Sequence, residues 1–245
     1  MLHYTRKGTG EKLVLVHGFL GDAEIFSPIL EELTKSYDVV AVDLPGHGQS
    51  KVERESYSVY DYAREVSEVL RHENITNATW LGHSLGGYIV LAALEKKIAP
   101  ISNAILAYTT DGSDTEEQKE KRTNQQLEIP EIGVEKFVDQ LIEAFFSDQA
   151  NKETINFARK IAYRASEEGL ILALESMKNR PNQQNLIENI SIPILVVEGS
   201  QDKIVKPIKT MNSNIQRLET NTAHLGMLED PNSFLKGIQE FMSEN

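Results

Sequence analysis

Short apolar runs alternate with amphipathic segments near both ends of the chain. The apolar runs cover residues 13–16, 39–44, 79–81, 104–107 and 194–197. Segments with apolar residues at helical spacing cover residues 25–33, 59–70, 86–95 and 232–241. Buried strands produce the first pattern and amphipathic helices the second. Their alternation is typical of βαβ units, so the sequence predicts an α/β fold with a mostly parallel sheet.

The stretch between Tyr108 and Ile192 contains no clear strand pattern. It is too long for a structureless connection inside a compact domain. Apolar residues recur at helical spacing in two parts of it, at 134–146 and at 170–177. We therefore predict a helical insertion, with a core formed by residues 1–108 and 187–245 and a helical cap formed by residues 109–186.

A G-x-S-x-G pentapeptide, residues 82–86, stands between the apolar run that ends at Leu81 and the helical segment that follows. A serine at a tight strand-to-helix turn presents its hydroxyl above the sheet, and the flanking glycines leave room for that turn. The alternative is a glycine-rich turn with an incidental serine. The pattern favours Ser84 as a nucleophile.

A serine nucleophile needs a base and a group that orients the base. His224 follows the last strand candidate and precedes the final helix, and Asp202 follows the run at 194–197. Asp202 would orient His224, which would take the proton from Ser84. Asp111, after the run at 104–107, is an alternative acid. The interval between Asp202 and His224 is short for the helix and strand expected within it.

Two backbone N–H groups should stabilise the oxyanion of an acyl-transfer intermediate, and we assign them to Phe19 and Leu85. Neighbouring residues and cap aromatics predict a mainly apolar substrate pocket, formed by Leu20, Tyr88, Phe137, Phe145, Leu225 and Met227. No basic cluster marks an anion-binding subsite, although three cap arginines could reach the pocket: Arg159, Arg164 and Arg180.

Composition narrows the classes of function. The formal charge of −12 disfavours nucleic acid and anionic membranes as partners. The chain has no cysteine, no signal-peptide pattern and no apolar run that could span a bilayer, which predicts a cytoplasmic protein. The histidines and acids lack metal-binding spacing, so we expect neither metal nor cofactor.

Five segments together resemble the successive motifs of bacterial α/β-hydrolases: residues 13–21, 43–50, 82–87, 199–202 and 223–231. The chain is most similar to carboxylesterases and to the enol-lactonase and non-haem haloperoxidase branch. The resemblance implies a mostly parallel sheet of about eight strands, flanked by helices and covered by an inserted cap, with Ser84, Asp202 and His224 as the catalytic triad.

Two departures from related enzymes narrow the expected reaction. Dehalogenases and epoxide hydrolases of this fold carry aspartate where this chain has Ser84. The menaquinone-pathway lyase carries arginine where this chain has Tyr88, which removes an expected partner for a carboxylate. We therefore expect a serine hydrolase that cleaves small esters or lactones with water. The alternatives are a cofactor-free C–C bond hydrolase or lyase and a non-catalytic ligand receptor.

Overall fold

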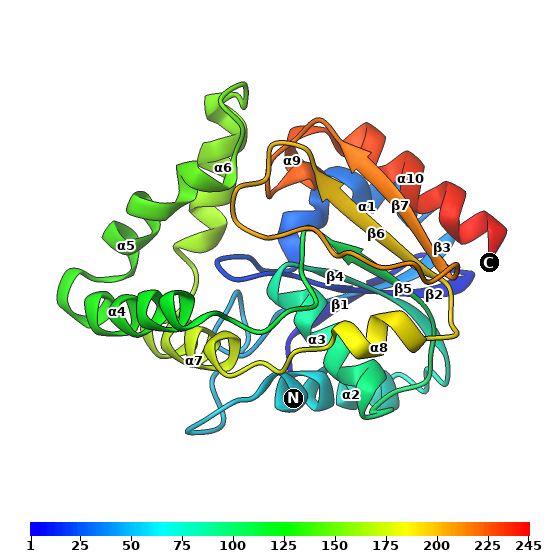
Figure 1. The fold of residues 1–245 in the computed structure, drawn as a ribbon, viewed down its shortest axis with the longest axis horizontal. Helices are drawn as coiled ribbons and strands as arrows, with labels where there is room; N and C mark the ends of the chain where they lie inside the picture. Colours follow the sequence, from blue (N-terminus) through cyan, green and yellow to red (C-terminus); the bar gives the residue numbers. More distant parts are fainter.

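The computed structural model describes residues 1–245 and is built around one twisted sheet (Figure 1). The strands lie in the order β1-β3-β2-β4-β5-β6-β7, and only β1 is antiparallel to its neighbour. Their bounds are β1 Tyr4–Lys7, β2 Glu11–Val16, β3 Tyr37–Val42, β4 Ala78–His83, β5 Ile101–Ala107, β6 Ile194–Gly199 and β7 Ile215–Thr220. The sheet has seven strands, whereas the sequence predicted about eight. Six of them are parallel, and β1 is the single antiparallel strand before this set.

Helices cover both faces of the sheet (Figure 1). One face carries α2 (Val59–His72), α3 (Leu85–Glu95) and α8 (Gln184–Asn189), and the other carries α1 (Ser27–Leu33), the short α9 (Gly226–Glu229) and α10 (Pro231–Glu244). Every residue of β4 is buried between these layers. A parallel strand that is covered on both faces has a nearly continuous apolar sequence, which explains why the central strands could be predicted.

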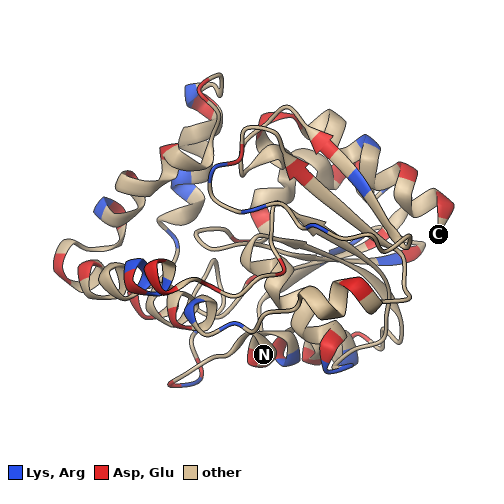
Figure 2. Cartoon of the chain, viewed as in Figure 1, with Lys and Arg blue, Asp and Glu red and all other residues tan.

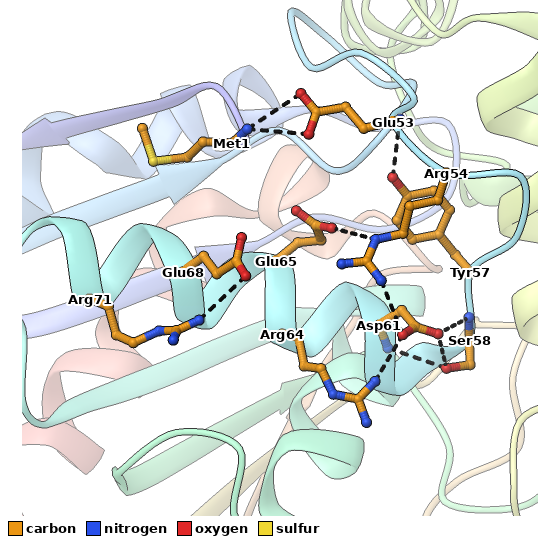
Figure 3. Close-up of polar contacts among 10 residues, drawn as sticks. All are labelled: Met1, Glu53, Arg54, Tyr57, Ser58, Asp61, Arg64, Glu65, Glu68 and Arg71. Atoms are coloured by element: carbon orange, nitrogen blue, oxygen red, sulfur yellow. Dashed lines mark hydrogen bonds and ion pairs between the residues drawn. The ribbon is translucent and has the colours of Figure 1, made fainter.

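The start of α2 is fixed by side chains of the preceding loop (Figure 3). Ser58 and Asp61 form a reciprocal capping box, which satisfies N–H groups that the first turn leaves without partners. Arg54 pairs with Glu65 and with Asp61. The amino group of Met1 pairs with Glu53 of the same loop. These contacts hold the loop that leads from β3 to α2.

The segment between β5 and β6 is helical throughout its ordered elements. It contains α4 (Glu116–Ile132), α5 (Val134–Leu141), a 3-10 turn η2 (Ile142–Phe145), α6 (Lys152–Ala162), α7 (Glu167–Lys178) and α8. Figure 1 shows α4 to α7 at one end of the sheet, and α4 packs on α7. Arg164, after α6, pairs with Asp22 and Glu24 of the core. No helix of the chain combines the length and apolar character that crossing a membrane requires.

Candidate active site

Ser84 occupies a strained turn between β4 and α3. Its φ of 51° and ψ of −112° lie outside the regions that a non-glycine residue ordinarily adopts. The turn brings its flanks very close to the sheet: a Cβ on Gly86 would lie 2.1 Å from the carbonyl oxygen of Val16, and one on Gly82 would lie 2.3 Å from the oxygen of Gly86. Glycine is therefore required at both positions.

Ser84, His224 and Asp202 form one hydrogen-bonded chain although they come from distant parts of the sequence. The distance from Ser84 Oγ to His224 Nε2 is 2.9 Å, and the distance from His224 Nδ1 to Asp202 Oδ2 is 2.8 Å. An ionised carboxylate only accepts hydrogen bonds, so Nδ1 carries the proton that Asp202 accepts. This leaves Nε2 as an acceptor for the Ser84 hydroxyl.

Asp202 lies in the loop after β6, and His224 in the loop after β7, so both are at the carboxyl ends of parallel strands. The other oxygen of Asp202, Oδ1, accepts hydrogen bonds from the N–H groups of Ile204 and Val205, at 2.7 and 3.4 Å. The connection between β6 and β7 contains no helix. The short interval between Asp202 and His224 therefore has to accommodate only one strand.

The backbone of His224 is held on two sides. His83 Nε2 donates to the carbonyl oxygen of His224 at 2.9 Å, and the N–H of His224 donates to the carbonyl oxygen of Phe145 in η2 at 3.1 Å. Burial lowers the pKa of His83 well below its ordinary value, so it remains a neutral donor. The Phe145 ring also meets the His224 ring edge-on, with centroids 5.4 Å apart. No sequence motif marks His83 or the Phe145 carbonyl as positioning groups, because both act through contacts between distant segments.

The turn after β2 presses against Ser84. A Cβ on Gly18 would lie 3.0 Å from Ser84 Cβ, which places the neighbouring Phe19 beside the serine. The N–H groups of Phe19 and Leu85 have no acceptor within the chain. His17 Nδ1 donates to the Gly18 carbonyl at 2.8 Å and its Nε2 accepts from the N–H of Leu44 at 2.8 Å. Burial lowers the pKa of His17 to about 3, so its ring is uncharged when it makes these two hydrogen bonds.

Asp111, the alternative acid, makes no hydrogen bond with His224. Its carboxyl group is buried, its Oδ2 has no partner, and burial raises its pKa. It lines the same cavity as Ser84 and His224. The geometry therefore pairs His224 with Asp202 and leaves Asp111 as a separate buried carboxyl.

A cavity of about 600 Å³ opens onto Ser84 and His224. Of the expected pocket residues, Tyr88 and Phe145 line it. The others are buried and face the packed interior: Leu20, Phe137, Leu225 and Met227. Phe137, for example, packs edge-on against Phe19, with ring centroids 6.4 Å apart, because the first turns of α5 press onto the core.

The lining departs from the mainly apolar pocket that the sequence suggested. Eight of its 27 residues are hydrophobic, and six are lysine or arginine. Arg180 reaches the cavity, whereas Arg159 and Arg164 do not line it. No group of three or more histidine, aspartate or glutamate side chains is arranged to hold a metal ion.

Two curated relatives illustrate how far sequence similarity extends. The chain is 38% identical over 105 residues to an uncharacterized hydrolase, YugF, of Bacillus subtilis, a match covering 42% of this chain and 38% of that protein. It is 28% identical over 224 residues to an (E)-2-((N-methylformamido)methylene)succinate hydrolase of Acinetobacter baylyi, covering 87% of this chain and 80% of the relative.

Solved structures match over nearly the whole chain. An esterase from Thermogutta terrifontis, determined with malate bound, superposes with a TM-score of 0.93 at 26% identity, covering 99% of this chain and 93% of the other. MenH from S. aureus superposes with a TM-score of 0.87 at 26% identity, covering 100% and 99%. The family model described as alpha/beta hydrolase fold matches residues 12–186. With its mostly parallel sheet and flanking helices, the chain belongs to the α/β-hydrolase fold family.

Proposed function

We propose that this hydrolase cleaves small carboxylic esters or lactones through an acyl-enzyme on Ser84. The observation that carries the proposal is the hydrogen-bonded chain from Ser84 through His224 to Asp202, with Ser84 and His224 lining a cavity. A receptor that only bound ligand would not require a nucleophile, base and orienting carboxylate in contact. Similarity to an esterase at 26% identity adds support.

The proposed reaction begins when Ser84 Oγ attacks the substrate carbonyl and His224 Nε2 takes the hydroxyl proton. The carboxylate of Asp202 stabilises the imidazolium that forms. The oxyanion of the tetrahedral intermediate is held by the free N–H groups of Phe19 and Leu85. His224 then protonates the departing alcohol, and the same imidazole activates the water that releases the acid.

We further propose residues 109–186 as a cap domain over a core of residues 1–108 and 187–245. The cap would shape the substrate site through Phe145, whose backbone and ring both contact His224. Arg164 and its partners Asp22 and Glu24 would anchor the cap to the core. No metal or cofactor enters the proposed reaction.

A lyase or C–C bond hydrolase reaction is the second candidate. It is favoured by a curated relative, a 2-succinyl-6-hydroxy-2,4-cyclohexadiene-1-carboxylate synthase of Yersinia enterocolitica, which is 24% identical over 248 residues and matches 98% of this chain. The same serine, histidine and aspartate would then act on a carbon acid or a dienoate. Turnover of dienoate substrates without turnover of esters would favour this candidate over the first.

Kinetics of Ser84→Ala with 4-nitrophenyl butyrate test the proposal. We expect kcat to fall at least 10³-fold while the circular dichroism spectrum stays unchanged, because the nucleophile is lost and the fold is not. Ser36→Ala, at an exposed serine without side-chain hydrogen bonds, is the matched control and should retain wild-type kinetics. Full activity of Ser84→Ala would refute the assignment.

A further inference from the structure

The cavity beside Ser84 is a positively charged region of a strongly acidic chain. The chain has a formal charge of −12, yet six lining residues are basic and two are acidic. The basic residues are Lys121, Arg122, Arg180, Lys203, Lys206 and Lys209. Figure 2 shows basic positions along the connection between β6 and β7, whereas Asp and Glu prevail over most of the ribbon. Such a local concentration of one charge attracts ligands of the opposite charge.

Arg180 is the buried member of this group, with a side chain only 4% exposed. Its Nε donates to the carbonyl oxygen of Gly112 at 2.9 Å, and its Nη1 pairs with Asp114 and donates to the carbonyl oxygen of Met177. Its Cζ lies 4.2 Å from the centroid of the Tyr88 ring. Nη2 has no partner in the chain. A guanidinium held this rigidly is pre-organised to bind a carboxylate.

The two acidic lining residues do not cancel this charge. Asp114 is shared by Arg122 and Arg180, which leaves one positive charge in excess. Burial raises the pKa of Asp111, and even when both acids are ionised they number two against six basic side chains. The four lysines of the lining form no ion pair. Their charge is available to an incoming ligand.

We propose that the cavity selects esters that carry a carboxylate. The carboxylate binds at Nη2 of Arg180, and the lysines of the β6–β7 connection attract the substrate to the cavity. The inference rests on the proposed esterase function of Ser84. Tyr88 lies four residues after Ser84 on α3, about one helical pitch of ~5.4 Å along the helix. Several carbon atoms must therefore separate the carboxylate from the reacting carbonyl, as in a monoester of a short dicarboxylic acid.

The test compares monoethyl adipate with ethyl hexanoate, which have six-carbon acyl chains and differ in a terminal carboxylate. We expect a kcat/KM at least tenfold higher for monoethyl adipate. Arg180→Gln should lower the ratio of the two kcat/KM values at least tenfold. Arg159→Gln, a cap variant outside the lining, is the matched control and should keep the ratio. Because the ratio is measured within one protein, a general loss of active enzyme does not change it.

A second variant guards against misfolding of Arg180→Gln. Replacing Lys203, Lys206 and Lys209 with glutamine changes only exposed side chains. It should lower kcat/KM for monoethyl adipate about threefold or more and weaken its dependence on salt. Free adipate, and not inorganic phosphate at equal ionic strength, should inhibit ethyl hexanoate hydrolysis; stronger inhibition by phosphate would contradict a carboxylate site.

The outcomes separate this inference from the proposed function. A wild-type ratio of one or less, or a ratio that neither variant changes, overturns the carboxylate site while ester hydrolysis stands. Hydrolysis of neither ester contradicts the esterase function instead. In that case calorimetric binding of adipate to the Ser84→Ala protein still decides the site: binding that Arg180→Gln abolishes supports it, and no binding overturns it.

Discussion

Asp202→Asn is expected to disable the base without moving it. Oδ1 of Asp202 accepts two backbone N–H groups, and Oδ2 accepts the Nδ1 proton of His224. An asparagine keeps its carbonyl oxygen on the two backbone donors, so its NH₂ group faces Nδ1. His224 must then carry its proton on Nε2, where it can no longer accept the proton of Ser84. We expect kcat to fall by about 10²–10⁴-fold, or roughly 3–5 kcal/mol of transition-state stabilisation.

The assay is kcat for 4-nitrophenyl butyrate, with Asp111→Asn compared in parallel. Asp111 makes no hydrogen bond with His224, so this variant should keep kcat within about tenfold of the wild-type value. Unfolding in urea should confirm that both variants remain folded. The reasoning is refuted if Asp111→Asn loses activity to the larger extent, or if Asp202→Asn retains wild-type kcat.

Three further predictions concern the scaffold. Burial lowers the pKa of His47 to about 4, so the unfolded chain takes up its proton first as pH falls. Between about pH 6.5 and 4, this histidine should therefore reduce the free energy of unfolding by up to ~1.4 kcal/mol per pH unit. In urea titrations at several pH values, the free energy of unfolding of His47→Gln should fall less steeply with decreasing pH than that of the wild type. Equal slopes of unfolding free energy against pH for the two proteins would contradict this. Tyr62 has a buried hydroxyl without a partner, so Tyr62→Phe should raise the free energy of unfolding by about 1 kcal/mol, and a clear decrease would reveal an unseen partner. Gly86→Ala should destabilise the fold by about 1–3 kcal/mol or more, because its Cβ would meet the Val16 carbonyl, whereas Gly112→Ala, with nothing within 4 Å, is the control. Equal unfolding free energies for the two alanine variants would argue against a tight turn at Ser84.

The central strands and the helices that cover them could be predicted from sequence, because both patterns arise from burial. The first and last strands could not. β1 has two exposed residues out of four, and β7 lies at the sheet edge, where Ile215–Thr220 is half exposed and polar. Edge strands have one neighbour and less burial, so their sequences lack the apolar run that marks the centre of the sheet.

The residues of the hydrogen-bonded chain could also be predicted, since Ser84 and Asp202 directly follow strand candidates and His224 lies between the last strand candidate and the final helix. What the sequence could not reveal are contacts between distant segments. The carbonyl oxygen of Phe145, from η2, meets the backbone of His224, and His83 holds the other side. The basic lining residues are scattered from position 121 to position 209. Only the packing of α4, α7 and the β6–β7 connection around one cavity brings their charges together.

Covalent labelling tests the central claim most directly. The wild-type protein is incubated with a fluorophosphonate at neutral pH, digested, and examined by mass spectrometry. We predict one equivalent of label on the peptide that contains Ser84, no label on Ser84→Ala, and strongly slowed labelling of Asp202→Asn. Label on another serine, or an unlabelled wild-type protein that still hydrolyses esters, would contradict the account.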